Sequence, residues 1–284
     1  MKYFEAEFVI SPCTTDACDL VAALAGEAGF ETFEETETGL RGYVQQSLFD
    51  ESALQSALED FPIGGVEITY TIREAEDRDW NEQWEQEGFE PIVIADQLVI
   101  HDGRHLPTVA PKISIEIDAK LAFGTGTHET TRMICKALLD TQLDGKRVLD
   151  CGTGTGILAI CAIKLGAREA VGYDIDEWSV DNARHNAVIN HVDNRFNQLL
   201  GDASILSTVE GNFDVVLANI NRNILLADMP SLRAKMATGA KLILSGFYTD
   251  DCGKLIEKAQ SLSLSLEEQK VDQNWAALTF TLPA

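Results

Sequence analysis

The sequence predicts an α/β protein in which a mostly parallel, doubly wound sheet follows a smaller N-terminal α+β domain of ferredoxin-like type. From residue 130 onward, strand-like apolar runs alternate with helix-like runs, the pattern of a parallel sheet covered on both faces. Residues 3–72 instead follow a β-α-β-β-α-β order. A length of 284 residues suits two domains. We therefore expect domains at residues 1–73 and 92–284, joined by a helical connector at residues 74–91.

The elements of the N-terminal domain follow from alternating patterns and from residues that start and stop helices. Asp16 and Asp50 precede the two helical stretches as N-caps, and Gly29 ends the first of them. A hairpin turns near Thr38-Gly39. The predicted strands are residues 3–10, 30–36, 40–46 and 66–72, and the predicted helices are residues 16–28 and 50–58.

The connector and the second domain continue this pattern. Trp80 and Trp84 are four residues apart, so both indoles lie on one helix face. We expect them to pack the connector against a domain, and direct contact with the substrate is the alternative. Beyond the connector, apolar runs of strand length alternate with stretches of helical periodicity. The predicted strands are residues 92–100, 113–117, 147–150, 170–174, 214–218, 241–244, 263–269 and 275–281, and the predicted helices are residues 130–139, 156–165, 177–189, 224–236 and 250–261.

The charge of the chain limits the classes of macromolecule that it is expected to bind. The net charge is −24, and residues 1–90 alone hold 22 acidic and 4 basic side chains. A negative field of this size repels phosphate backbones and attracts basic proteins, although acidic side chains also serve simply to keep a protein in solution. We therefore expect a basic protein partner and no direct reading of nucleic acid.

Composition also bounds the compartment. No apolar run approaches the roughly 18 residues that a membrane span needs, and the N-terminus has no apolar signal region. The six cysteines form no paired array with histidines, which argues against a zinc site and fits a reducing compartment. We expect a cytoplasmic monomer that contacts no membrane and binds no metal.

The central motif is the run Asp150-Cys151-Gly152-Thr153-Gly154, which follows a strand and opens a helix. Its glycines let the backbone approach a bound nucleotide at the carboxyl edge of the sheet, as in dinucleotide enzymes. A carboxylate at Asp150 would repel pyrophosphate there, whereas it would attract the ammonium group of the phosphate-free S-adenosylmethionine. We therefore expect Gly152 and Gly154 to border S-adenosylmethionine, which becomes S-adenosylhomocysteine after methyl transfer.

Two acids that follow later strands complete the predicted nucleoside site. Asp174 ends a strand roughly 20 residues after the glycines, which is the place of a ribose ligand. Its other possible role is to cap the next helix, but Asp176 suits that role better. Asp202, after the third strand region, is placed either to accept a hydrogen bond from the adenine amine or to cap a short helix.

Two further motifs give the chain a family resemblance. One is Phe-Gly-Thr-Gly-Thr-His at residues 123–128 with the paired threonines 130–131, and the other is the run at residues 215–220 that contains Asn219. With the acidic N-terminal domain and the two-tryptophan connector, nearly the whole chain resembles the bacterial ribosomal protein L11 methyltransferases. The resemblance implies a class I methyltransferase fold, which is Rossmann-like, behind a ferredoxin-like domain that recognises the substrate. It also implies methylation of lysine ε-amino groups and of the N-terminal α-amino group of that ribosomal protein.

The resemblance also indicates site residues. The cofactor contacts of the family fall on Thr131, Gly152, Asp174 and Asn219 of this chain. The sequence departs from the family pattern at Glu129, where proline is usual, and after Asn219, where Asn-Ile-Asn-Arg stands in place of Asn-Ile-Leu-Ala. The second departure lies beside the reaction centre and therefore bears on the substrate.

Asn219 is the residue that we expect to act in the transfer. Its amide oxygen and the carbonyl of Ile220 can accept hydrogen bonds from the substrate amine, which orients the nitrogen lone pair. The alternative role of Asn219 is to form a turn after its strand. Thr131, at the start of a helix, either meets the cofactor carboxylate or is an ordinary helix threonine. His128 is either a proton acceptor or a loop histidine with a structural hydrogen bond.

Other functions compete with this interpretation. A related methyltransferase would act on another amino or amide substrate, but Ile220-Asn221 replaces the prolines and aromatic ring that are common in enzymes for amides and nucleobases. A non-catalytic ribosome-assembly factor on the same fold would not require an intact glycine loop. An NAD(P) oxidoreductase is disfavoured by Asp150.

Overall fold

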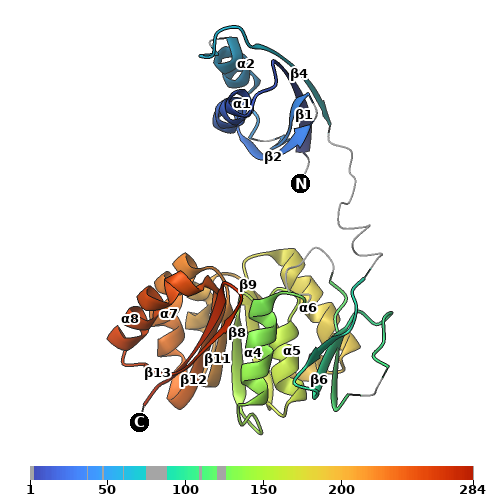
Figure 1. The fold of residues 1–284 in the computed structure, drawn as a ribbon. Coiled ribbons are helices and arrows are strands. Elements are labelled where there is room, and N and C mark those ends of the chain that lie inside the picture. The colour runs from blue at the N-terminus through green and yellow to red at the C-terminus, as the bar shows by residue number, and fades with distance from the viewer. Residues whose placement is uncertain are drawn as a thin grey trace. The chain divides into compact units, whose positions relative to one another are not determined.

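The computed structural model describes residues 3–36, 38–46, 48–59, 61–74, 88–108, 111–119 and 126–283. The chain folds as two compact units, Met1–Glu82 and Gln83–Ala284 (Figure 1). Trp80 and Trp84, with most of the predicted helical connector, lie outside the described residues. Residues 123–125 of the Phe-Gly-Thr-Gly-Thr-His motif lie outside them as well.

The N-terminal unit contains a four-stranded antiparallel sheet with the strand order β2-β3-β1-β4. Ala6, Phe8 and Ile10 of β1 alternate toward one face, where they share an apolar core with Val21 of α1 and Leu54 of α2. This order and its two helices form the split β-α-β arrangement. The elements are β1 (Tyr3–Ser11), α1 (Thr15–Glu27), β2 (Phe30–Thr36), β3 (Gly39–Gln45), α2 (Glu51–Glu59) and β4 (Glu67–Glu74).

The two helices of this unit begin differently from one another. The N-cap of α1 is Thr14, whose side chain accepts from the backbone of Ala17, so the prediction of Asp16 as N-cap is wrong by two residues. Threonine is a favourable N-cap residue, as aspartate is, so the residue type at position 14 suits this role. Asp50 is confirmed at the second helix, where it accepts hydrogen bonds from Ser52 and from the backbone of Ala53.

A small three-stranded sheet opens the second unit, with the order β5-β6-β7. The single strand predicted at residues 92–100 is in fact a hairpin of β5 (Ile92–Ile94) and β6 (Leu98–His101), and β7 (Ile113–Glu116) pairs parallel to β6. The turn uses positive φ angles at Ala95 and Asp96. Such a turn usually carries glycine or asparagine, and their absence hid it in the sequence.

The main sheet of the second unit has seven strands in the order β10-β9-β8-β11-β12-β14-β13. The first five strands run parallel to one another, and β14 and β13 close the edge in antiparallel pairs. Because the strand order reverses between β8 and β11, the crevice at their carboxyl ends is the expected ligand site of a doubly wound sheet. The strands are β8 (Arg147–Cys151), β9 (Glu169–Asp174), β10 (Phe196–Leu200), β11 (Phe213–Asn219), β12 (Met236–Tyr248), β13 (Ser265–Asp272) and β14 (Trp275–Thr281).

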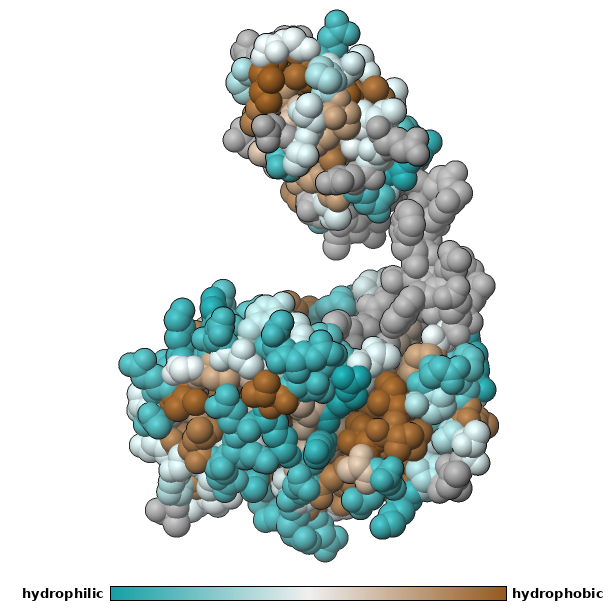
Figure 2. All heavy atoms as spheres, in the orientation of Figure 1, coloured by the Kyte–Doolittle hydropathy of each residue, from teal (hydrophilic) through white to brown (hydrophobic). Residues whose placement is uncertain are grey.

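Helices cover both faces of this sheet and enclose two apolar clusters. Alternate residues of β8 divide between them: Val148 packs in the cluster that contains α4, α5 and α6, whereas Leu149 and Cys151 pack in the cluster that contains α7 and α8. On the side drawn in Figure 2, hydrophilic side chains cover much of the surface of this unit. The helices are α4 (Glu129–Leu139), α5 (Ile157–Lys164), α6 (Glu177–Ile189), α7 (Arg222–Ala234) and α8 (Cys252–Ser261).

The predicted α/β class is therefore confirmed. Within the described ranges, no helix is both long enough and apolar enough to span a bilayer.

Candidate functional site

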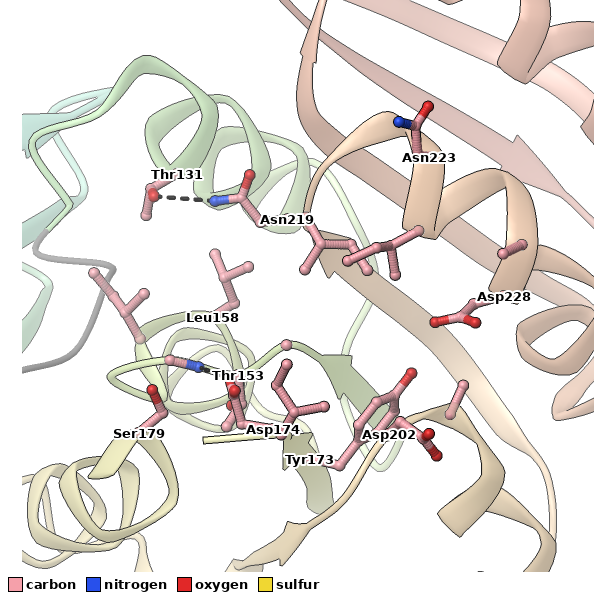
Figure 3. Close-up of a pocket in the computed structure, with 18 residues that line it drawn as sticks. Thr131, Thr153, Leu158, Tyr173, Asp174, Ser179, Asp202, Asn219, Asn223 and Asp228 are labelled. Atoms are coloured by element: carbon pink, nitrogen blue, oxygen red, sulfur yellow. Dashed lines mark hydrogen bonds between the residues drawn. The ribbon is translucent and has the colours of Figure 1, made fainter. Parts of the chain in front are cut away.

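A cavity of about 740 Å³ lies at the carboxyl ends of β8, β9 and β11, where the strand order reverses (Figure 3). All five residues expected at the site line this one cavity, although they come from four different stretches of the chain: Thr131, Gly152, Gly154, Asp174 and Asn219. A volume of this size accommodates a nucleoside with an amino acid side arm. The structure therefore brings together the site that the sequence indicated.

The glycine loop turns sharply above the end of β8. The backbone N–H groups of Gly152 and Thr153 both donate to the carbonyl of Tyr173 on β9, at 2.9 and 3.0 Å. Gly152 has φ +67°, and a Cβ atom there would lie 2.4 Å from Cγ2 of Ile220. A side chain is thus excluded at Gly152 both by the backbone conformation and by Ile220, so the loop presents bare backbone to the cavity.

Asp174 is held from two sides. Its Oδ2 accepts from the backbone N–H of Gly154 at 2.9 Å, and its Oδ1 accepts from the backbone N–H of Asp176 at 3.2 Å. Each oxygen of a carboxylate has a second lone pair that remains available to a hydroxyl donor. Asp176, as predicted, is the N-cap of α6, since it accepts from both the backbone and the hydroxyl of Ser179.

Asp150 does not reach the cavity, and the expectation that it faces the ammonium group is wrong. It is completely buried beneath the loop, where its Oδ2 accepts from Thr153 Oγ1 at 2.8 Å and from the backbone of Ala159 at 3.2 Å. The pleat points Asp150 to the same face as Val148, toward α5, rather than to the edge of the sheet. Burial, with a smaller contribution from the charge of Asp174, raises the pKa of Asp150 to about 7.

The electrostatic argument against pyrophosphate rests instead on the residues that do line the cavity. Three of them are aspartates, Asp174, Asp202 and Asp228, and none of the described lining residues is lysine or arginine. Burial and the neighbouring charge of Asp202 raise the pKa of Asp228, which faces the cavity from α7 (Figure 3). Three carboxyl groups without a basic partner suit a cationic ligand and oppose a phosphate.

Asn219 ends β11 and points toward Thr131 at the start of α4 (Figure 3). Its Nδ2 donates to Thr131 Oγ1 at 3.3 Å, and Thr131 is almost completely buried. Its Oδ1 is shielded from water and accepts no hydrogen bond from the described part of the chain. A buried acceptor without a donor costs roughly 1–3 kcal/mol, so this oxygen is suited to a donor that arrives with a ligand.

His128 and Asp202, for each of which the sequence allowed two roles, are both helix N-caps in the structure. His128 is the N-cap of α4, where its Nδ1 accepts from the backbone of Thr130 at 3.3 Å. Asp202 caps a short 3-10 helix (Ala203–Thr208) through the backbone of Ser204, and it also lines the cavity. The structural role is thus present at both positions, and an adenine contact at Asp202 stays a prediction.

Several lining residues were not anticipated from the sequence. Ile224, Ala227 and Asp228 of α7 line the cavity, and the helix begins at Arg222 because Asn221 caps it, rather than at residue 224 as predicted. Their spacing is that of one helix face, which sequence patterns cannot distinguish from a face packed in a core. The departure from the family pattern at Asn221 therefore supplies a helix cap next to the site.

Ile220 is fixed between two glycines. Its side chain occupies the space beside Gly152, and a Cβ atom at Gly246 of β12 would lie 2.6 Å from its carbonyl oxygen and 2.8 Å from its nitrogen. Gly246 also has φ +92°. The backbone after Asn219 can therefore pass this close to β12 only where β12 has no side chain.

The residues present fit S-adenosylmethionine. The loop offers backbone at two glycines, Asp174 offers acceptors for a diol, and the Oδ1 of Asn219 has no donor from the part of the chain that the structure describes. The lining suits a positively charged ligand, as a sulfonium with an ammonium group is. Among the described residues, no group of three or more His, Cys, Asp or Glu side chains is arranged to hold a metal ion.

Comparison with known proteins agrees with this arrangement. Residues 15–283 match the model of the family described as ribosomal protein L11 methyltransferase (PrmA). The chain is 47% identical over 282 residues to the ribosomal protein L11 methyltransferase of Phocaeicola vulgatus, which covers 99% of this chain and 100% of that protein. It is 48% identical over 281 residues to the protein of the same name from Bacteroides thetaiotaomicron, with the same coverage.

A solved structure shows the same relationship. The crystal structure of a ribosomal protein L11 methylase from Lactobacillus delbrueckii subsp. bulgaricus superimposes with a TM-score of 0.63 at 28% identity. The match covers 69% of this chain and 100% of that chain.

Proposed function

The chain belongs to the ribosomal protein L11 methyltransferase family, and from that premise we propose that it transfers methyl groups from S-adenosylmethionine to lysine ε-amino groups and to the N-terminal α-amino group of ribosomal protein L11. The observation that carries the choice of an amine acceptor is the Asn219 side chain. Its buried Oδ1 accepts from no donor among the described residues, and Asn219 lies at the end of β11 on the cavity wall.

The reaction requires a neutral nitrogen with its lone pair directed at the methyl carbon. A free lysine amine has a pKa of about 10.4 and is mostly protonated near neutral pH, but an apolar enclosure favours its neutral form. Bound S-adenosylmethionine supplies a methyl group on a positively charged sulfur. The nitrogen lone pair forms the new N–C bond as the C–S bond breaks, and the product ammonium then releases a proton to solvent.

Asn219 and its neighbour orient the acceptor in this proposal. The Oδ1 of Asn219 accepts a hydrogen bond from the amine, which aims the lone pair and stabilises the positive charge that grows on nitrogen. The hydrogen bond from Nδ2 to Thr131 engages the amide nitrogen, so the oxygen is the atom of the Asn219 side chain that is left to accept from the amine. The carbonyl of Ile220 is a second candidate acceptor.

The cofactor contacts follow from the donors and acceptors around the cavity. Asp174 accepts from the ribose hydroxyls, since the backbone of Gly154 already orients its carboxylate. Thr131 and the first turn of α4 receive the cofactor carboxylate, because the N-terminus of a helix favours an anion. Gly152 and Gly154 allow the close approach of the nucleoside to the loop.

The proposal extends to the partner and the setting. The acidic N-terminal domain recognises the basic ribosomal protein by charge complementarity, without direct reading of nucleic acid. We infer a cytoplasmic, monomeric enzyme that uses no metal ion. Full activity after dialysis against a strong chelator would support the metal-free mechanism, and loss of activity that Mg²⁺ or Zn²⁺ restores would refute it.

The decisive experiment offers tritiated S-adenosylmethionine to the protein with ribosomal proteins from a strain that lacks the methylation. Label on L11 lysines and on its N-terminus, located by peptide mapping, supports the proposal. Label only on another ribosomal protein or on RNA refutes the substrate. Absence of transfer by a preparation that binds the cofactor would favour a non-catalytic assembly factor.

A further inference from the structure

The thiols of Cys13 and Cys18 lie side by side at the start of α1, far along the chain from the cofactor cavity. Their sulfur atoms are 3.6 Å apart. Cys13 is exposed, whereas Cys18 is buried against the core of the N-terminal unit. From this juxtaposition we propose that Cys13 and Cys18 form a site of reversible oxidation, at which hydrogen peroxide produces an intramolecular disulfide.

The position of the pair on the helix explains their proximity. Thr14 is the N-cap of α1, so Cys13 immediately precedes the cap and Cys18 occupies the fourth helical position. Side chains at these two positions commonly pack against each other as a hydrophobic staple. The contact is therefore a consequence of how the helix begins, and it is maintained as long as the cap is intact.

The two thiols differ in access, which fixes the order of the chemistry. Hydrogen peroxide reaches the exposed Cys13 sulfur first and transfers one oxygen to it, which gives a sulfenic acid and releases one water. The Cys18 sulfur then attacks this sulfenic sulfur, the S–S bond forms and a second water leaves. Two thiol hydrogens and two electrons pass to the peroxide, and a dithiol reductant reverses the change.

The chain provides an internal control for proximity without access. Cys135 of α4 and Cys161 of α5 also interact with each other, but both are completely buried in the core of the second unit. Buried structural cysteines are inert, whereas reactive cysteines are at least partly exposed. Only the Cys13–Cys18 pair should therefore react in the folded protein.

The test treats the full chain with a small excess of hydrogen peroxide and maps its peptides after alkylation under non-reducing conditions. We expect a loss of two hydrogen masses, a peptide pair linked through Cys13 and Cys18, and recovery of both thiols with dithiothreitol. In Cys18→Ala, dimedone should label Cys13 as the trapped sulfenic acid, and Cys13→Ala should show no linkage. Linkage that persists in either variant, or oxidation of Cys13 to sulfinic acid with no linkage in the unmodified chain, would overturn the proposal.

A second inference comes from a row of asparagines on α6 and rests on the proposed binding of S-adenosylmethionine. Asn182, Asn186 and Asn190 are four residues apart and are all buried. Asn190 Oδ1 accepts from the backbone N–H of Glu116 at 3.1 Å, and Asn190 Nδ2 donates to the Glu116 carbonyl at 2.6 Å. Asn186 accepts a hydrogen bond from the backbone N–H of Asp118, and Asn182 donates one to the Asp118 carbonyl.

Asn186 connects this row to the glycine loop through Thr155. Its Oδ1 accepts from the backbone of Asp118 at 3.0 Å, while its Nδ2 donates to the carbonyl of Thr155 at 2.9 Å. We infer that Asn186 is a positioning residue that fixes the glycine loop for the cofactor. It acts through the Thr155 carbonyl and does not line the cavity itself.

The matched pair Asn186→Asp and Asn190→Asp separates positioning from stability. Each change keeps an oxygen that accepts from the 116–118 backbone. Asn186→Asp removes an NH₂ group that donates to the Thr155 carbonyl and to Asn182 Oδ1, whereas Asn190→Asp removes one that donates to the carbonyls of Glu116 and Asn186. The hydrogen bond to Thr155 of the glycine loop is therefore lost in the first variant and kept in the second. Binding of S-adenosylhomocysteine, measured by calorimetry, should weaken about tenfold in Asn186→Asp and stay within about twofold in Asn190→Asp, at similar losses of melting temperature.

The outcomes distinguish this inference from the proposed function. No binding by the unmodified chain would refute the proposed cofactor, whereas normal binding by both the unmodified chain and Asn186→Asp would refute the positioning role alone. Equal weakening by both variants would also refute it, since a general loss of stability would then suffice. If Asn186→Asp and Asn190→Asp do not fold, Asn186→Ala and Asn190→Ala give the same comparison.

Discussion

The side-chain amide of Asn219 donates to the hydroxyl of Thr131 across 88 positions of sequence, at 3.3 Å. This hydrogen bond uses the nitrogen of the amide and leaves its buried oxygen without a donor from the described residues. The proposed acceptor site therefore depends on the meeting of β11 and α4, and the following variants examine it from different sides.

Asn219→Ala should lower the rate of methyl transfer by about 100-fold, because it removes a preorganised acceptor for the amine. Cofactor affinity should fall much less. Single-turnover kinetics with L11, beside calorimetry with S-adenosylhomocysteine, measure the two effects separately. A variant that transfers methyl groups at the original rate would exclude Asn219 from the mechanism.

Asp174→Ala should weaken cofactor binding by roughly 1–3 kcal/mol, because it removes charge-assisted hydrogen bonds to the ribose. The control is Asp176→Ala, two residues away, which removes the N-cap of α6 and should cost about 1 kcal/mol of stability while affinity changes little. Calorimetry and urea unfolding distinguish the two. Undiminished affinity in Asp174→Ala would refute the ribose contact.

Gly246→Ala should reduce activity by about tenfold or more, because the new Cβ atom displaces the backbone of Ile220 beside Asn219. Gly239→Ala is its control on the same strand. Gly239 also has a positive φ, +76°, but nothing lies within 4 Å of its Cβ position, so only local strain is added there. Comparable activity in the two alanine variants would show that the position of Ile220 has no bearing on transfer.

The buried carboxyl of Asp150 should make stability depend on pH. Its pKa is raised to about 7 in the folded protein from the ordinary value of 3.8, so between these values the folded state binds more protons than the unfolded state. The contribution of Asp150 therefore grows less favourable as pH rises from about 4 to about 7, by on the order of 4 kcal/mol in all, and is constant above.

Asp150→Asn provides the measurement. The neutral amide keeps an acceptor for Thr153 and Ala159, so the variant should gain stability over the unmodified chain at about pH 8 and lose that advantage at about pH 5. Urea unfolding at both pH values gives the difference. A stability difference that is the same at both would mean that Asp150 does not titrate in this range.

The features of the site that depend on local chain chemistry were predictable from the sequence. Gly152 and Gly154 had to follow a strand and precede a helix, and Asp174 and Asn219 had to end their strands, because glycine conformation and apolar periodicity are written within a few residues. Since the carboxyl ends of parallel strands lie at one edge of the sheet, these residues were expected to lie close together at that edge.

Which of these side chains face the cavity depends on how distant segments of the chain pack against the sheet. The pleat of β8 and the position of α5 turned Asp150 into the interior, and the packing of α7 brought in Asp228, which the sequence did not single out. The hairpin at residues 92–101 likewise turns at Ala95 and Asp96 without a glycine. Side-chain direction depends on what covers each face of the sheet, and that covering comes from segments that are distant in the chain.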